Sequence, residues 1–192
     1  MVTGHFGLAA GVKAYERFVP LWALMVATAW LDVIFIFTYA TGAETIDDAP
    51  GTNGGYGDVI IHADYTHSLI GAAVIAIVTG WIVTRWWGRR GGIVIGAVVF
   101  SHWILDLIVH RDDMPIFPGN AGDIRVGFGL WEHHAAAAAA EAALIVAGAF
   151  LYWRAATQVE RAANARPRRA NLVTALILLC GALVLAVDVF IG

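Results

Sequence analysis

The sequence predicts an all-α integral membrane protein, and three observations support this fold class. Of the 192 residues, 59% are hydrophobic and only 14% are charged. The mean hydropathy of +0.70 is higher than a soluble domain needs. Several apolar runs approach or exceed the roughly 18 to 20 residues that cross a hydrocarbon core. We therefore expect residues 1–192 to form a single transmembrane helical domain.

Five runs are long enough to span a membrane, near residues 20–40, 67–87, 91–110, 133–153 and 171–191. The first run is interpreted as a retained span, because its apolar core is longer than that of a signal peptide and contains Asp32. Residues 3–13 are apolar but too short to cross. For them we expect a short interfacial or re-entrant helix.

Basic residues predict the orientation of these spans. They flank the first run at Lys13 and Arg17, and they recur within residues 85–90 and 154–169. The positive-inside rule places these segments in the cytoplasm, so the N-terminus is expected on the cytoplasmic side of a bacterial inner membrane. A net charge of −3 without a basic tail excludes nucleic acid as an expected partner. The oligomeric state stays open, and a homo-oligomer is one option.

The most informative stretch is residues 101–113, S-H-W-I-L-D-L-I-V-H-R-D-D. On a helix, the i, i+4 spacing puts His102, Asp106 and His110 on one face. Ionisable groups within an apolar helix are costly unless they meet partners or a metal ion, so this face is a candidate functional site. Asp32 lies about 18 Å along the first span from its start, slightly past the membrane centre. We expect Asp32 to face a positive charge or, alternatively, to be a neutral side chain bonded to a neighbouring helix.

Depth along the spans makes a shared site plausible. His67 stands where Thr66 or Ser68 can cap the second span, in the expected outer half of the membrane. Asp32, His102, Asp106 and His110 fall between the membrane centre and the same outer surface. His5 either joins them through a re-entrant segment or is an interfacial histidine in water. Glu141, in an alanine-rich span, is either a further carboxylate of the site or a protonated interhelical hydrogen-bonding group.

The donor types indicate a metal. Imidazoles with carboxylates suit Zn²⁺ first, with Fe²⁺ or Mn²⁺ as alternatives, and the lone Cys180 excludes a thiolate site. A catalytic ion keeps a position open for water, and a nearby carboxylate can then act as a general base. Glu132 and Asp113 are the candidate bases. His110 and His5 are candidate proton carriers or accessory ligands.

Several blocks of the chain also resemble a known family. In order, these are G-H-F-G-L-A-A-G-V-K, A-W-L-D, Y-T-H-S-L, S-H-W-I-L-D-L-I-V-H-R-D-D-M-P and G-F-G-L-W-E. They resemble the YdjM-type membrane-bound metal-dependent hydrolases over roughly the first three quarters of the chain. The resemblance implies a polar metal-binding core made of His5, Asp32, His67, His102 and Asp106.

The chain departs from the family pattern at three positions. The pattern has Gln near Trp30, Pro at Asp64 and Asn at Glu132. The two additional acids lie near the expected mouth of the site, so they bear on metal and substrate preference.

The expected function is hydrolysis of a lipid-like ester or phosphoester drawn from membrane lipid. Two other classes stay open. A haem-binding or electron-transfer anchor would use paired helix histidines, but Asp106 one turn from His102 disfavours it. A proton-coupled transporter or auxiliary membrane subunit would use the acids and histidines as a relay.

Overall fold

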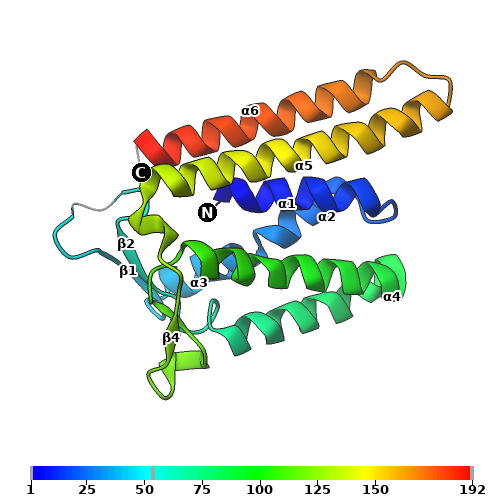
Figure 1. Cartoon of the computed structure of the whole chain (residues 1–192). Coiled ribbons are helices and arrows are strands. Elements are labelled where there is room, and N and C mark those ends of the chain that lie inside the picture. Colours follow the sequence, from blue (N-terminus) through cyan, green and yellow to red (C-terminus); the bar gives the residue numbers. More distant parts are fainter. Residues whose placement is uncertain (1, 53–54, 191–192) are drawn as a thin grey trace.

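The computed structural model describes residues 2–52 and 55–190 and is mostly helical (Figure 1). The helices are α1 (Val2–Tyr15), α2 (Leu21–Thr28), α3 (Trp30–Ala40), α4 (Leu69–Val109), α5 (His134–Ala162) and α6 (Arg168–Phe190). Short 3₁₀ turns, η1 (Pro118–Asn120) and η2 (Leu130–Glu132), lie in the connection between α4 and α5. The expectation of a mostly helical fold is confirmed.

Two antiparallel β-hairpins at one end of the bundle correct the expectation of a purely α-helical chain (Figure 1). Strand β1 (Thr45–Asp48) pairs with β2 (Val59–His62), and β3 (Met114–Pro115) pairs with β4 (Arg125–Val126). The many Gly and Asp residues of the first connection are typical of a polar loop and do not predict these strands. The β-branched residues at 59–61 favour a strand, and pairing with β1 satisfies their backbone groups. We call this the hairpin end of the bundle.

Three helices, α4, α5 and α6, are long and apolar enough to cross a membrane. Helices α2 and α3 together form a fourth, broken candidate, bent by 46°. The first predicted span is therefore not one continuous helix. The break falls at Ala29, whose backbone lies outside the helical region at φ −102° and ψ 11°. The total of five spans stays a prediction.

Helix α4 contains a reversal that explains its 41 residues. Gly88 adopts φ 63°, a left-handed conformation that glycine tolerates best, and the two halves of α4 run back along each other (Figure 1). Their backbones pack closely, because a Cβ added to Gly80 would lie 2.7 Å from the Gly92 carbonyl oxygen. The runs predicted at residues 67–87 and 91–110 correspond to these two halves.

Helix α1 lies inside the bundle, packed along α5 (Figure 1). Its backbone touches that of α5, since a Cβ added to Gly148 would lie 1.8 Å from the Gly7 carbonyl oxygen. The helix is packed within the bundle, with His5 buried, so His5 is not a histidine exposed to water. Helix α1 starts toward the hairpin end and finishes at the opposite end (Figure 1). The side of the membrane that the N-terminus faces stays a prediction.

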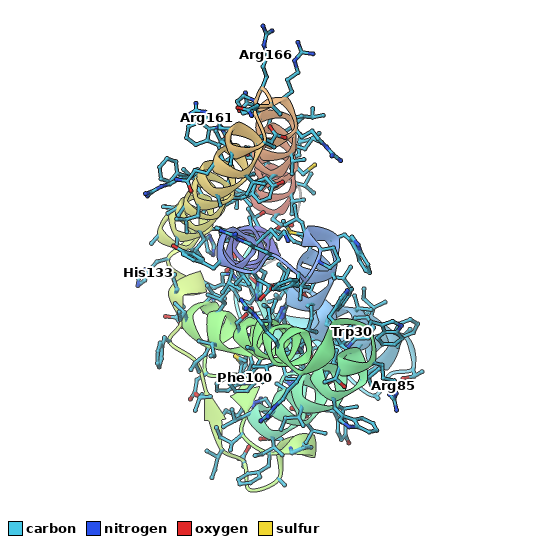
Figure 2. The ribbon with its side chains drawn as sticks, turned by 90° about the vertical axis from the view of Figure 1, so that its right-hand side faces the viewer. Trp30, Arg85, Phe100, His133, Arg161 and Arg166 are labelled. Carbon is cyan, nitrogen blue, oxygen red and sulfur yellow. The ribbon has the colours of Figure 1, made fainter. Side chains whose placement is uncertain are left out.

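The opposite end of the bundle carries several arginines. Figure 2 looks onto this end, where Arg161 extends from the last turn of α5 and Arg166 from the turn before α6. Glu16, which is buried, accepts a hydrogen bond from Arg90 at 3.0 Å and one from the Phe18 amide at 2.7 Å. Burial would raise the pKa of Glu16, but these hydrogen bonds and the Arg90 charge hold it below its usual value. This ion pair joins the segment after α1 to the second half of α4.

The α1–α5 contact predicts opposite effects of the same substitution at two glycines. A Cβ at Gly7 would lie 2.4 Å from the Leu144 carbonyl oxygen, whereas one at Gly11 would meet nothing closer than 3.7 Å. Gly7→Ala should lower the free energy of unfolding by about 1–3 kcal/mol through overpacking. Gly11→Ala should leave it unchanged or raise it, because alanine favours helix. Denaturant unfolding in detergent measures both, and equal effects would contradict this packing.

Candidate metal centre

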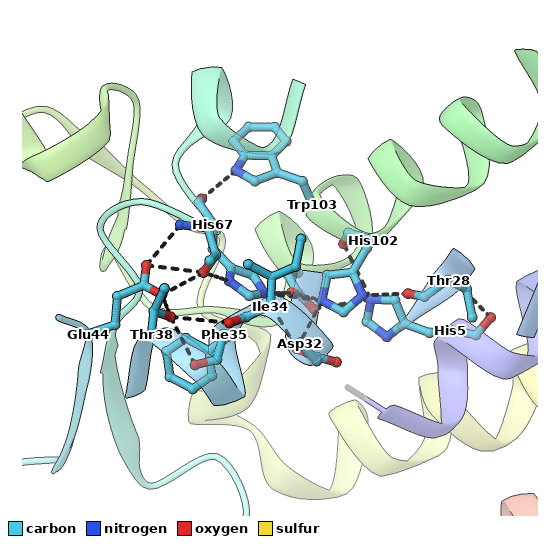
Figure 3. A network of polar contacts seen from close by, with 12 residues as sticks. His5, Thr28, Asp32, Ile34, Phe35, Thr38, Glu44, His67, His102 and Trp103 are labelled. Carbon is cyan, nitrogen blue, oxygen red and sulfur yellow. Dashed lines mark hydrogen bonds and ion pairs between the residues drawn. The ribbon is translucent and has the colours of Figure 1, made fainter. Parts of the chain in front are cut away.

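Five residues predicted as ligands form two groups of three that share His102. Figure 3 shows His5, Asp32, His67 and His102 gathered together. His5 comes from α1, Asp32 from the first turn of α3, and His67 from the residue before the Ser68 cap of α4. His102 and Asp106 follow one another on the second half of α4. Four of the side chains are at most 6% exposed, and only Asp32 is open, at 41%.

The distances place these side chains around a common centre. The His102 Nε2 atom lies 2.9 Å from Asp106 Oδ2, 3.3 Å from Asp32 Oδ1 and 3.2 Å from His67 Nε2. His67 Nε2 lies 3.5 Å from Asp32 Oδ1, and His5 Nε2 lies 3.4 Å from Asp106 Oδ1. The predicted convergence of the imidazoles and carboxylates is thus present in the structure.

The break between α2 and α3 orients His102. Helix α2 ends at Thr28, so the Thr28 carbonyl is one of the terminal carbonyls that need an outside donor. His102 Nδ1 lies 2.6 Å from this oxygen. Because a carbonyl only accepts, Nδ1 carries the proton in this contact, and in the neutral ring Nε2 presents a lone pair to the cluster. The Thr28 hydroxyl also donates to the His5 carbonyl at 3.1 Å.

A second chain of contacts orients His67 (Figure 3). His67 Nδ1 lies 2.9 Å from the Thr66 hydroxyl oxygen. That hydroxyl lies 3.0 and 3.1 Å from the two oxygens of Glu44, which is buried. A hydroxyl that donates to a carboxylate accepts from Nδ1–H, so the neutral His67 ring also presents a lone pair at Nε2. Trp103 Nε1 donates to the His67 carbonyl at 2.8 Å and holds the backbone in place.

These donors fit a divalent metal ion. Two imidazole nitrogens with outward lone pairs would repel each other at 3.2 Å, and two carboxylates add two negative charges at the same point. One divalent cation would balance both carboxylates and accept the nitrogen lone pairs. Nitrogen and oxygen donors suit Zn²⁺, Fe²⁺ or Mn²⁺, and Cys180 is exposed on α6, away from this group.

The donors form two overlapping groups that share His102. One contains His5 and Asp106, and the other contains Asp32 and His67. His102 Nδ1 is engaged with Thr28, so only Nε2 is free to serve as a ligand. A single nitrogen lone pair binds one ion, and the geometry therefore favours one centre over two.

The cluster opens into a cavity of about 330 Å³. Its walls come from α3, the segment ending in β2, α4, η2 and α6, and they include Phe35, Ile61, Trp131 and Asp188. Phe35 packs edge-on against the His67 ring at a centroid distance of 5.8 Å. The site thus combines a polar base with mainly apolar walls, which is the composition of a small-molecule pocket.

A second histidine–carboxylate pair lies at this cavity, where its histidine, His110, lines the wall. His110 Nδ1 lies 3.0 Å from Asp113 Oδ1, and the Ile61 amide donates to Asp113 Oδ2 at 3.2 Å. Both side chains are buried, and Trp131 packs on the His110 ring at 4.5 Å. Because Nδ1 faces the carboxylate, Nε2 is the ring nitrogen left for proton transfer. His110 and Asp113 were both predicted as catalytic candidates.

Glu132, the other predicted base, is not brought to the cluster. Its exposed carboxylate lies 3.3 Å from Arg111, whose other nitrogen lies 3.5 Å from Asp58. His134 Nε2 lies 3.2 Å from Asp58 as well. These residues form an ion-pair group at the hairpin end, and no part of it lines the cavity wall beside the cluster.

Glu141 does not belong to the group of candidate metal ligands. It holds the start of α1 through hydrogen bonds. This fully buried carboxylate accepts from the Thr3 amide at 3.1 Å, the Gly4 amide at 3.3 Å and the Tyr56 hydroxyl at 2.8 Å. It satisfies first-turn amides of α1 that have no partner within the helix. Burial and the nearby Glu141 carboxylate raise the pKa of Tyr56, so its hydroxyl remains a donor. Glu141 thereby sets the position of the adjacent His5.

Three supporting residues were missed in the sequence analysis. Thr28 and Thr66 carry no ligand spacing, and Glu44 stands among acids of a polar connection. Only Thr66 gave a signal, as a neighbour of His67 in T-H-S, and that signal was interpreted as a helix cap. Ser68 is the residue that caps α4, accepting from the Gly71 amide at 3.1 Å.

Substitution of Glu141 tests its part in holding α1. Glu141→Ala leaves the Thr3 and Gly4 amides without their acceptor, and each unsatisfied buried group costs about 1–3 kcal/mol. We expect a lower free energy of unfolding and faster hydrogen exchange in the first turn of α1. Glu141→Gln keeps one carbonyl oxygen and should lose less. Gln158→Ala, an exposed position on the same helix, is the control, and equal stability of Glu141→Ala and this control would contradict the role.

Comparison with known proteins finds no matching family model, no matching curated protein and no matching solved structure. The likeness to the YdjM-type hydrolases therefore stays an expectation based on the motifs, and the functional argument depends on the geometry of the site.

Proposed function

We propose that this protein is a metal-dependent membrane hydrolase that acts on a lipid-like ester or phosphoester. The observation that carries the proposal is the set of facing nitrogen and carboxylate donors in the cluster. His67, His102, Asp32 and Asp106 would hold one divalent ion, with His5 as a further ligand. Zn²⁺ is the first candidate, and Fe²⁺ or Mn²⁺ fit the same donors.

The surroundings of the cluster favour hydrolysis over simple metal storage. Asp32 is 41% exposed and lines the cavity, so the base of the cavity is accessible to a small molecule. Apolar walls beside a polar base suit an amphipathic substrate. When bound, the ion would supply a Lewis acid that polarises an ester or phosphoryl oxygen and makes water easier to deprotonate.

The protein residues would handle the proton of the attacking water. His110 Nε2 would take this proton as the water oxygen bonds to the carbonyl carbon or phosphorus. The same nitrogen would return the proton to the leaving oxygen as the scissile bond breaks, which completes addition of one water molecule. Asp113 would hold the imidazole through Nδ1 and stabilise its charged form.

We also propose five membrane passes, with α2 and α3 as one broken pass and the two halves of α4 as two. The reversal at Gly88 supports this count. The arginines at the end shown in Figure 2 support a cytoplasmic location of that end in a bacterial inner membrane. The cavity would then open in the outer half of the bilayer, where membrane lipid is the nearest substrate source.

The cluster geometry disfavours a haem anchor. Two axial histidines bind on opposite faces of a porphyrin, whereas His67 and His102 here face each other at 3.2 Å with carboxylates beside them. A proton relay remains the other explanation for the same donors, and metal analysis separates it from the hydrolase.

The direct test is the metal content of detergent-purified protein. We expect about one equivalent of transition metal per chain, and His102→Ala or Asp106→Ala should abolish it because each removes a central donor. His133→Ala, an exposed histidine at the start of α5, should keep the metal. Folded wild-type protein that neither contains nor takes up Zn²⁺, Fe²⁺ or Mn²⁺ would contradict the proposal.

The proposed proton carrier gives a separate prediction. Asp113→Asn and His110→Ala should lower the rate of ester or phosphoester hydrolysis by about 10²- to 10⁴-fold, the usual contribution of a general base. Metal content should stay the same, since neither residue is a ligand. Metal lost in parallel with activity would show that the pair belongs to the metal centre instead.

A further inference from the structure

We propose that Glu44 is a positioning residue that acts through Thr66 to fix the proton of His67 on Nδ1 and so prepares Nε2 as a ligand. The metal-binding part of this inference rests on the proposed function. The positioning itself concerns the chain alone.

Glu44 is buried, unlike the other acids of the polar connection that contains it. It lies only 1% exposed in the connection between α3 and β1. Its Oε1 accepts from the amides of Tyr65 and Thr66, both at 2.8 Å, and the Thr66 hydroxyl lies within reach of both oxygens. The Thr38 hydroxyl donates to Oε2. The carboxylate is thus saturated by donors from two segments.

Those two segments each carry a proposed ligand. Thr38 lies on α3, as does Asp32, and Thr66 immediately precedes His67. By accepting from both segments, Glu44 joins the end of α3 to the start of α4 (Figure 3). Its position therefore sets how Asp32 and His67 stand relative to each other, at 3.5 Å between Oδ1 and Nε2.

The direction of the hydrogen bonds gives Glu44 a chemical effect as well. A carboxylate has no proton to donate, so the single hydroxyl proton of Thr66 points to Glu44. The hydroxyl oxygen then accepts from His67 Nδ1 at 2.9 Å. Without this acceptor, Nε2 could carry the proton and donate it to Asp32 Oδ1 or to Asp106 Oδ2, which lies 3.6 Å away. The tautomer with the proton on Nε2 has no lone pair at that atom for a metal ion. The Nε2 proton would have to leave before His67 could bind the ion there.

The expected effect on metal affinity can be estimated from other metal sites. Outer groups that orient a metal-binding histidine typically contribute 10- to 100-fold to metal affinity. Thr28 performs the equivalent task for His102 with a backbone carbonyl, which no side-chain substitution removes. Only the contact that orients the His67 ring involves a side chain, Thr66, so the orientation of His67 can be tested by mutation.

The experiment compares four variants by histidine tautomer and by zinc affinity. Thr66→Val removes the hydroxyl at nearly constant volume, and Thr66→Ser keeps it. Glu44→Gln keeps the shape but removes the charge, and its amide can donate to the Thr66 oxygen in competition with His67. Glu132→Gln changes an exposed acid at the same end of the bundle and is the matched control.

Nitrogen NMR of metal-free, ¹⁵N-histidine-labelled protein reports the tautomer, with the His67 signals identified by their loss in His67→Gln. We expect Nδ1–H in the wild type, in Thr66→Ser and in Glu132→Gln. In Thr66→Val the proton should move largely to Nε2, and Glu44→Gln should give a mixture. A merely structural role of Glu44 would change stability without moving this proton.

Zinc affinity, measured by competition with a chromophoric chelator, should fall about 10- to 100-fold in Thr66→Val and by a smaller factor in Glu44→Gln. An unchanged tautomer in folded Thr66→Val would overturn the inference. So would zinc affinity within about a factor of two of the wild-type value. If the wild type binds no metal, the proposed function fails, while the tautomer measurement still decides whether Glu44 and Thr66 position His67.

Discussion

The structure depends on one electrostatic constraint: two carboxylates and two imidazole lone pairs meet at the base of a cavity, and of these groups only Asp32 is substantially exposed. Asp106 and His102 are 5% and 1% exposed, and their atoms approach to 2.9 Å. Such a group is unfavourable in an apolar bundle unless a cation compensates it. The constraint explains why donors from four separate segments approach one another within a few ångströms. The rest of the chain packs mainly alanine, glycine and aliphatic side chains.

Three of the four segments reach this point through an irregularity of the backbone, whereas His102 and Asp106 lie in the regular second half of α4. Helix α1 begins inside the bundle, and Glu141 supplies the acceptor that its first amides lack. The first predicted span breaks at Ala29, which frees the Thr28 carbonyl for His102 and turns Asp32 toward the centre. His67 lies before the capped start of α4 rather than within it. Regular spanning helices would have satisfied their own backbone groups and left the side chains without these partners.

Part of this arrangement could be predicted from sequence because it is local. The i, i+4 spacing puts His102 and Asp106 on one face, and the depth of Asp32 indicates an ionisable group that needs compensation. The bend at Ala29 could not be predicted, since no proline or glycine marks it in residues 21–40. Glu44 looks like a solvated acid of a polar connection, and only the folding of that connection over Thr66 reveals its burial. Contacts of this kind depend on long-range packing, which local patterns do not encode.

The central claim is that the cluster is a metal centre with mixed imidazole and carboxylate donors. X-ray absorption spectroscopy of the zinc-loaded protein tests it most directly, because it reports the donors around the ion itself. The account predicts a first shell of nitrogen and oxygen near 2.0–2.1 Å, with outer-shell scattering from two or three imidazole rings that is lost in His102→Ala. A spectrum without imidazole scattering, or one dominated by sulfur or water donors, would contradict the account.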